Sequence, residues 1–91
     1  MQGFMYILLC SNGQYYTGST RNLNKRLAQH QKGEGAKFTK WHLPVKLVYH
    51  EEFRTYELAL SREKQVHGWS RKKKEALING EINNLHDLVK M

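Results

Sequence analysis

A glutamate stands in the middle of an apolar pattern that is typical of an amphipathic helix. Leu60 and Val66 lie three residues before and after Glu63, which puts the three side chains on one helical face. A carboxylate on an inward face is costly unless a cation compensates its charge. Two interpretations therefore stay open. In the structural one, Glu63 pairs with an arginine or a lysine or turns to the rim of the helix; in the functional one, it binds a metal ion.

Side-chain types that can move protons or stabilise negative charge also occur earlier in the chain, at Tyr6, Tyr16, Arg26 and His30. Gly18 adds a position with an open backbone. Each residue alone has an ordinary explanation, because tyrosines in strands mostly pack and an arginine beside leucines is mostly solvated. Chemistry follows only if the fold brings these groups to the point that Glu63 faces.

The two tyrosines fall on two predicted strands, 4–10 and 15–20, which form a hairpin. A two-residue Asn-Gly turn would place Tyr6 and Tyr16 on opposite faces. A three-residue loop that ends in a left-handed glycine would instead pair Tyr6 with Gly18. Asn-Gly favours the first turn. We nevertheless predict the second, because only it puts both phenols on one face, as the family resemblance described below implies.

The rest of the chain predicts three helices and a third strand. Asn22, Thr55 and Ser70 are suitable N-caps. We expect helices over 23–32, from Thr55 to about His67 and from Ser70 to about Ile78, a strand over 45–53, and an exposed basic loop over 33–44. Alternation puts Val45, Leu47 and Tyr49 on one side of the strand, and the tail from Gly80 to Met91 is expected to add another helical turn or two.

These elements predict an α+β fold in which helices flank a three-stranded, mostly antiparallel sheet, in the order β-β-α-β-α-α. We expect one domain over residues 1–91, with a core of about 4–78 and a tail over 79–91. Any site in a chain of 91 residues should be a surface cleft, because so small a core leaves little room for a buried pocket.

The charge favours a polyanionic partner, with nucleic acid ahead of an anionic membrane. The formal net charge is +7, and residues 1–50 hold seven cations and one acid. No apolar run is long enough to span a membrane, and Cys10 is the single cysteine, so we expect a cytoplasmic protein without a disulfide framework.

Taken in order, these residues resemble the core of a GIY-YIG nuclease domain. The matching stretches are Tyr6, then Tyr16-Thr17-Gly18, then Asn22 to Leu27 with His30, and then Ala59 to Glu63. The resemblance covers about residues 4–78 and extends to small stand-alone bacterial members, related to the catalytic domain of a DNA-repair excinuclease. Phe4, Met5 and Thr17 depart from the name-giving motifs, and the late asparagine of many members is not placed among Asn79, Asn83 and Asn84.

The resemblance implies hydrolysis of phosphodiester bonds in DNA with one divalent cation, Mg²⁺ or alternatively Mn²⁺. The residues agree, because Glu34 is the only acid before Glu51 and a two-metal carboxylate cluster is hard to build. In this scheme Glu63 binds the metal and Arg26 stabilises charge on the phosphate. Tyr6 is the candidate general base.

His30 or Tyr16 would accept or relay the proton, and the two tyrosines could exchange roles. The scheme requires nearby cations to lower the pKa of the base.

Substrate contacts are expected from Gly18, Lys25, Lys37, Lys40, Trp41, Arg71, Lys72 and Lys73, with Trp41 or Phe38 stacking on an unpaired base. Nothing in the chain encodes base readout, so we expect recognition of shape, nicks or flaps, as in DNA repair or processing. The alternatives are an inactive nucleic-acid-binding module of the same fold and a protein that binds RNA or a partner protein. No small-molecule cofactor is expected, and the oligomeric state stays open.

Overall fold

The computed structural model describes residues 2–81 of the chain, which form three strands and four helices. The strands are β1 (Gly3–Leu9), β2 (Tyr15–Thr20) and β3 (Lys46–Phe53). The helices are α1 (Leu23–Gln31), α2 (Lys37–Lys40), α3 (Tyr56–His67) and α4 (Arg71–Ile78). The α+β class and the order of the predicted elements are confirmed, with one short helix added.

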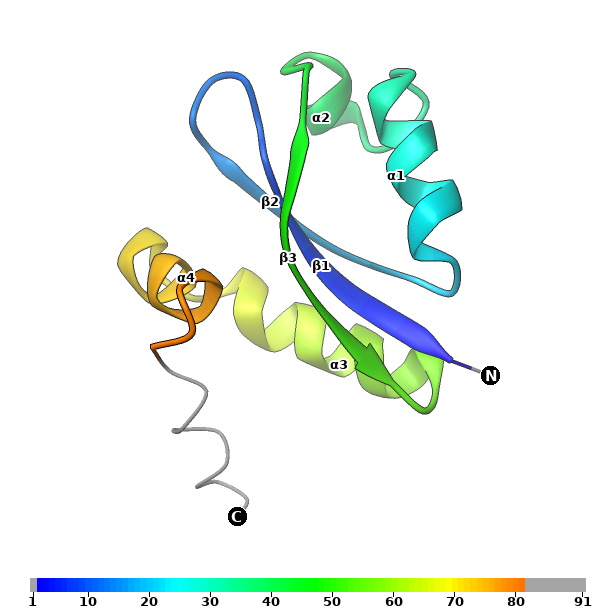
Figure 1. The fold of residues 1–91 in the computed structure, drawn as a ribbon, viewed down its shortest axis with the longest axis vertical. Coiled ribbons are helices and arrows are strands. Elements are labelled where there is room, and N and C mark those ends of the chain that lie inside the picture. The colour runs from blue at the N-terminus through cyan, green and yellow to red at the C-terminus, as the bar shows by residue number, and fades with distance from the viewer. Residues whose placement is uncertain (1, 82–91) are drawn as a thin grey trace.

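An antiparallel sheet with the strand order β2-β1-β3 lies at the centre of the molecule. Helices α1 and α2 lie on one face and α3 and α4 on the other (Figure 1). Alternate residues of β1 supply both cores: Met5 and Ile7 pack toward α3 and α4. Tyr6 and Leu8 pack toward α1. Because β1 is central, β2 and β3 are both edge strands.

The hairpin has the three-residue loop that the sequence analysis favoured. The Cys10 N–H donates to the Gln14 carbonyl at 2.9 Å, and Gly13 adopts a φ of 83°. Tyr6 lies opposite Gly18 and Leu8 opposite Tyr16. Both phenols therefore belong to the α1 face of the sheet, as expected.

The three predicted N-caps are confirmed as well. The side chains of Asn22, Thr55 and Ser70 accept hydrogen bonds from the backbone of the first turns of α1, α3 and α4. Each side chain satisfies a backbone N–H that has no partner inside its helix. The beginnings of these helices are thus determined locally.

The expected alternation along β3 is wrong at Tyr49. Val45 and Leu47 pack with the α1 side of the core, whereas Tyr49 packs with the α3 side. The reason is an irregularity in the pairing with β1, where the register shifts by one residue beside Val48. Residues beyond the shift have changed faces.

The expected exposed loop over 33–44 is also wrong, because it contains α2 and a fully buried threonine. Thr39 is 0% exposed, while Lys37 and Lys40 remain in solvent. Ala36 precedes the helix without a capping side chain. Contacts with α1, described below, therefore stabilise this turn more than local signals do.

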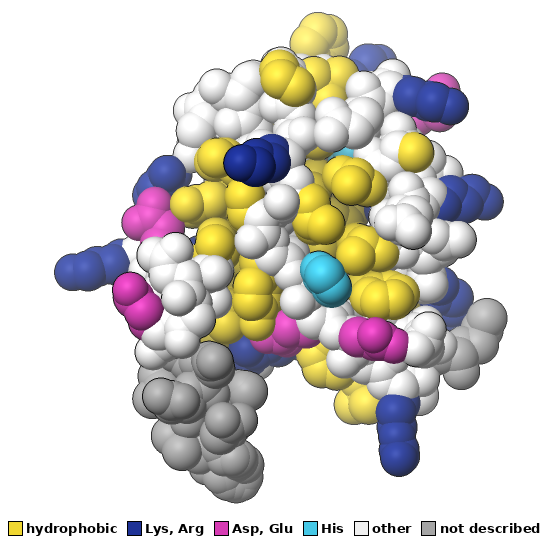
Figure 2. Space-filling model, in the orientation of Figure 1, with side chains coloured by type: hydrophobic (Ala, Val, Ile, Leu, Met, Phe, Trp, Pro, Cys, Tyr) yellow, Lys and Arg dark blue, Asp and Glu magenta, His cyan; other side chains and the backbone are white. Residues whose placement is uncertain are grey.

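Cationic side chains lie mostly at the rim of the face seen in Figure 2, and apolar side chains gather over β3. None of the described helices is long and apolar enough to cross a membrane. The helical turn expected in the tail falls largely on residues 82–91, outside the described residues.

Candidate active site

The candidate residues meet at edge strand β2, which carries alternate side chains to the two faces of the sheet. Tyr16 and Gly18 face α1, beside Tyr6. Ser19, the next residue, contacts Glu63 of α3 on the opposite face. The site is therefore a shallow surface that wraps around one edge of the sheet.

Gly18 is buried and makes room for the Tyr6 phenol. A Cβ atom built on Gly18 would lie 2.5 Å from the Tyr6 hydroxyl oxygen, which is closer than two such atoms can approach. The absent side chain thus explains a glycine in mid-strand. Gly18 is thus covered by the phenol, and its backbone is not open to a substrate as the sequence analysis expected.

A chain of buried hydrogen bonds fixes the Tyr6 hydroxyl. Its oxygen lies 2.8 Å from Nε2 of His30, and Nδ1 of His30 lies 2.8 Å from Oγ1 of Thr39. The Thr39 hydroxyl donates its own proton to the Ala36 carbonyl at 2.9 Å.

The direction of this chain follows by elimination. Because the single Thr39 proton is used, Thr39 accepts from His30, and Nδ1 carries the imidazole proton. Nε2 is then an acceptor, to which Tyr6 donates. The phenol oxygen can still accept hydrogen bonds, and the Arg26 guanidinium lies close enough to act on it.

Burial controls the ionisation of this chain. Burial, with the Arg26 charge as a smaller cause, lowers the pKa of His30 from 6.5 to about 4, so the imidazole is neutral at pH 7. Burial raises the pKa of Tyr6 to about 12, although Arg26 acts in the opposite direction. The expectation that cations lower the pKa of this phenol is therefore wrong in its net direction, because desolvation exceeds the effect of the single guanidinium.

Tyr16 completes the aromatic group on this face. Its ring centroid lies 5.4 Å from that of His30 and 6.4 Å from that of Tyr6. Burial raises the pKa of Tyr16, the Glu63 carboxylate raises it further, and Arg26 lowers it. Both phenols are therefore within electrostatic reach of the acid and of the guanidinium.

Arg26 is half-buried on α1 and forms no salt bridge with a carboxylate of residues 2–81. Its guanidinium donates to the Gln29 side chain at 3.1 Å. With Lys25 and Ser19 it lines a hollow of about 430 Å³ beside the end of β2. A permanently charged, planar donor at this place is suited to bind a phosphate.

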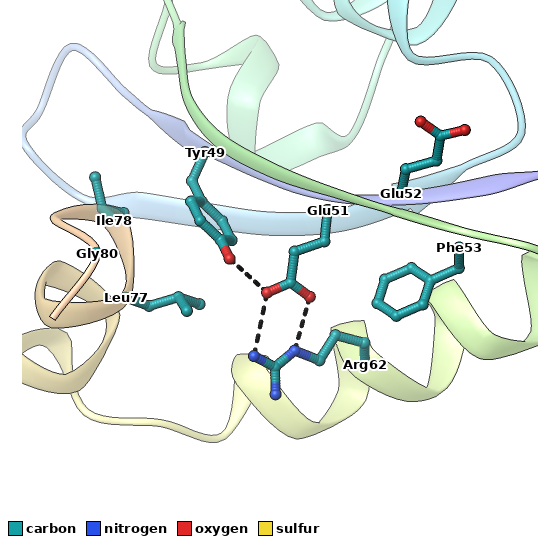
Figure 3. A pocket seen from close by; sticks show the side chains of 8 residues that line it. All are labelled: Tyr49, Glu51, Glu52, Phe53, Arg62, Leu77, Ile78 and Gly80. Carbon is teal, nitrogen blue, oxygen red and sulfur yellow. Dashed lines mark hydrogen bonds and ion pairs between the residues drawn. The ribbon is translucent and has the colours of Figure 1, made fainter. Parts of the chain in front are cut away.

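Glu63 is the acid of the site, and no described cation neutralises it. The Ser19 hydroxyl donates to Oε1 of Glu63 at 2.7 Å. Its neighbour Arg62 pairs instead with Glu51 of β3, at 2.9 Å, and Tyr49 also donates to Glu51 (Figure 3). The ion-pair interpretation of Glu63 therefore does not hold among the described residues.

A half-buried carboxylate without an ionic partner fits a divalent cation. No group of three or more His, Cys, Asp or Glu side chains gathers within the described part of the chain. A cation here would therefore have Glu63 as its carboxylate ligand, with water and substrate oxygens completing the shell, which is how Mg²⁺ is commonly held.

The expected substrate-binding side chains are more dispersed. Lys37, Lys40 and Lys72 are exposed, as is Trp41 at 71%. Lys73 lies over the Trp69 ring, with 4.2 Å from Nζ to the ring centroid.

Arg71 is engaged within the protein. It donates to the Gly13 carbonyl at 2.7 Å and lies over the Tyr15 ring, which connects α4 to the hairpin loop. It also pairs with Glu75 at 3.2 Å.

The sequence analysis missed two residues of this arrangement, Ser19 and Thr39. Ser19 could have been found from the hairpin register, because it lies opposite Met5 and so on the face of α3. Thr39 gave no such signal, since it lies in a segment whose pattern suggested a loop.

Comparison with known proteins identifies the family to which the chain belongs. A model of the GIY-YIG catalytic domain matches residues 2–76. The UPF0213 protein of Staphylococcus aureus is 45% identical over 75 residues, which cover 82% of this chain and 92% of that protein. The chain thus belongs to the GIY-YIG family, a nuclease superfamily whose members generally depend on a divalent metal and act on nucleic acid.

Two solved structures resemble this fold. The solution structure of a UPF0213 protein from Bacillus halodurans has a TM-score of 0.58 at 35% identity, over 100% of this chain and 97% of that one. A protein from E. faecalis has a TM-score of 0.59 at 33% identity, over 88% and 85% of the two chains. The similarity therefore extends over most of the length of both proteins.

Proposed function

We propose that the protein is an endonuclease that hydrolyses phosphodiester bonds in DNA with one bound Mg²⁺, for which Mn²⁺ could substitute. The observation that carries the proposal is the Glu63 carboxylate, which is half-buried and has no cationic partner among the described residues. It lies at the strand edge that carries Tyr16, within electrostatic reach of Arg26, and the Tyr6 phenol, only 2% exposed, is packed against Gly18 of the same strand. Glu63 would hold the cation, which when bound supplies Lewis-acid stabilisation of charge at the phosphate.

Tyr6 is the proposed general base, acting as a neutral phenol. Its oxygen accepts a proton from the attacking water while its own proton passes along the 2.8 Å hydrogen bond to Nε2 of His30. This relay needs no free phenolate, which agrees with the raised pKa of Tyr6. It does need a neutral imidazole, which His30 is at pH 7. Because the burial that keeps the imidazole neutral also disfavours the imidazolium, Nε2 would hold the extra proton only while the phosphate bond breaks.

Arg26 would bind the scissile phosphate and stabilise the charge that develops on it. Tyr16, beside His30 and within reach of Glu63, would position the phosphate or the water by a hydrogen bond. Hydrolysis then adds the water oxygen to phosphorus and breaks the bond to the leaving oxygen of the sugar. That oxygen takes up a proton from solvent, and His30 releases its extra proton to solvent.

The proposed phosphate contacts are Lys25 of α1 and Lys37 and Lys40 of α2, because all three are exposed on helices that cover the same face of the sheet. Such contacts position a nucleic acid without reading its sequence. We therefore propose selection by DNA structure, in repair or processing, in the cytoplasm.

Incubation with nicked, flapped and branched DNA in the presence of Mg²⁺ tests the function. Wild type should cut, and Glu63→Ala and Tyr6→Phe should reduce cutting by at least about a hundredfold, as losses of single catalytic groups do. Chelation of the metal should abolish cutting and its restoration should recover it. RNA of equal length is the substrate control.

Equal cutting by all three proteins would indicate a contaminating nuclease and refute the assignment. Binding without cutting by a folded wild-type protein would favour the inactive nucleic-acid-binding module.

A further inference from the structure

A second hollow, of about 510 Å³, runs along the outer edge of β2 and contains groups that the proposed hydrolysis does not use. Tyr16 lies at its border with the candidate active site. Thr17 of β2, Phe38 of α2 and Lys74 of α4 also line it. Three separate observations on these residues indicate that a ligand belongs there.

The first observation is an unsatisfied hydroxyl. Thr17 is only 4% exposed, and its Oγ1 is buried without a hydrogen-bond partner among the described residues. Buried polar groups nearly always have a partner, because leaving one unpaired is costly. A rotation about χ1 would bring this hydroxyl to the wall of the hollow that Thr17 lines, where a polar group of a ligand would satisfy it.

The second observation is an uncompensated cation. Lys74 is half-buried, and it forms no salt bridge with a carboxylate of residues 2–81. Burial lowers the pKa of Lys74, which shows that its charged form is poorly solvated here. An anion in the hollow would remove that cost.

The third observation is an accessible aromatic surface. The Phe38 ring is stacked near Tyr16, with centroids 6.4 Å apart and planes inclined by 15°, and it remains 37% exposed. Trp41, the C-cap residue of α2, is also exposed, and the Lys40 ammonium lies 5.8 Å from the centroid of its ring. Aromatic rings interleaved with cations are typical of surfaces that bind unpaired nucleotides.

We propose that this hollow is a subsite for one unpaired nucleotide, whose base stacks on Phe38 and whose phosphate binds Lys74. Thr17 would contribute a hydrogen bond to the same nucleotide. A paired base offers neither free face, because its neighbours in the duplex cover both. The inference rests on the proposed nuclease function and makes it more specific: the substrate has unpaired nucleotides directly beside the bond that is cut.

Binding without hydrolysis tests this subsite separately from catalysis. Labelled oligothymidylate and a hairpin of equal charge, whose fully paired strands are joined by a linker without nucleotides, are titrated in excess EDTA. Fluorescence anisotropy is the readout. Wild type should bind the single strand at least about tenfold more tightly than the hairpin, the order of one stacked base.

The variants are Phe38→Leu, which keeps the apolar volume without an aromatic face, and Lys74→Gln. Phe38→Leu should weaken single-strand binding about five- to one-hundredfold and hairpin binding little. Lys74→Gln should reduce the salt dependence of single-strand binding by about one phosphate contact. Lys46→Gln, on the opposite edge strand, is the matched control and should behave as wild type.

Equal affinity of wild type for both nucleic acids, or unchanged single-strand affinity in both folded variants, would overturn the subsite. A protein that prefers the single strand through Phe38 but cuts no substrate would retain the subsite and lose the nuclease function. A protein that cuts duplex and flap equally well would retain the nuclease function and lose the subsite.

Discussion

The hydrogen-bonded chain from Tyr6 to Thr39 carries most of the chemistry that we propose, and the sequence indicates some of its members better than others. Tyr6 and His30 belong to recognisable patterns, so the residues themselves could be predicted. Their ionisation could not, because burial decides it: His30 is 0% exposed. A sequence shows which charges exist but not how completely each is desolvated.

The buried histidine predicts a loss of stability in acid. The pKa of His30 is 6.5 in an ordinary setting and about 4 in the fold, so between these values the unfolded chain binds the extra proton. Stability is therefore complete above pH 6.5 and decreases as the pH falls toward 4, by up to about 3 kcal/mol.

Urea unfolding at pH 7 and pH 4.5 measures this difference. His30→Gln should remove most of the pH dependence, whereas His67→Gln, at an exposed position, should leave it intact. An identical pH dependence in wild type and His30→Gln would show that other groups are responsible.

Thr39 is predicted to determine the tautomer of His30. Thr39→Val keeps the volume but leaves Nδ1–H without an acceptor, at a cost of about 1–3 kcal/mol. The imidazole is then expected to carry its proton on Nε2, so that Nε2 donates to the Tyr6 oxygen instead of accepting from it. Nitrogen chemical shifts of His30 report the tautomer directly, and Thr39→Ser should restore the wild-type pattern. Wild-type nitrogen shifts in Thr39→Val would contradict this role.

At the scale of elements, edge strand β2 organises the site because neighbouring residues serve opposite faces. The hairpin register could be predicted only with the help of the family resemblance, which implied that both phenols share one face and so selected between two loops. The shift beside Val48 could not, because a bulge depends on the strand that pairs with it. Helix α2 was missed for a related reason: four residues without a capping side chain give no local signal.

Gly18 provides a test of this element. Gly18→Ala would place a Cβ 2.5 Å from the Tyr6 hydroxyl and 2.6 Å from Cζ, so the ring must move and its bond to His30 is lost. We expect a stability loss of about 1–3 kcal/mol, typical of overpacking in a core. Thermal unfolding measures it, and a crystal or solution structure shows the ring.

Gly68→Ala is the matched control for the loss of backbone freedom. Its φ is −82°, and the nearest atom to a new Cβ is 3.7 Å away, so it should change stability little. Equal effects of the two substitutions would show that the contact with Tyr6 is not what requires glycine at position 18.

For the molecule as a whole, the layered arrangement brings residues separated by most of the chain to one strand edge. The sequence indicated that Tyr6, Arg26 and Glu63 belong together through their resemblance to a family. It did not indicate that α1 and α3 reach the site from opposite faces, because periodicity defines which side of an element is buried and not which layer covers it.

The net charge of +7 predicts that affinity for DNA decreases steeply with salt, since each neutralised phosphate releases counterions. Lys25, beside Arg26 in the hollow at the end of β2, should contribute one such contact. Lys25→Gln is expected to lower the slope of log affinity against log salt by about one. A titration series in EDTA measures it, and a slope equal to that of wild type would exclude Lys25 from the interface.

The position of the site on β2 also has an evolutionary consequence. Gly18 and Ser19 are adjacent, yet Gly18 accommodates the phenol on one face and Ser19 binds the acid on the other. The two residues must therefore stay next to each other in the strand. A single residue inserted within 15–20 would turn the side chains that face α1 toward α3, and those that face α3 toward α1. It would thereby separate the acid from the aromatic group. Natural length variation in homologous chains should therefore concentrate at the hairpin tip, 11–14, and be absent from the strand beside it.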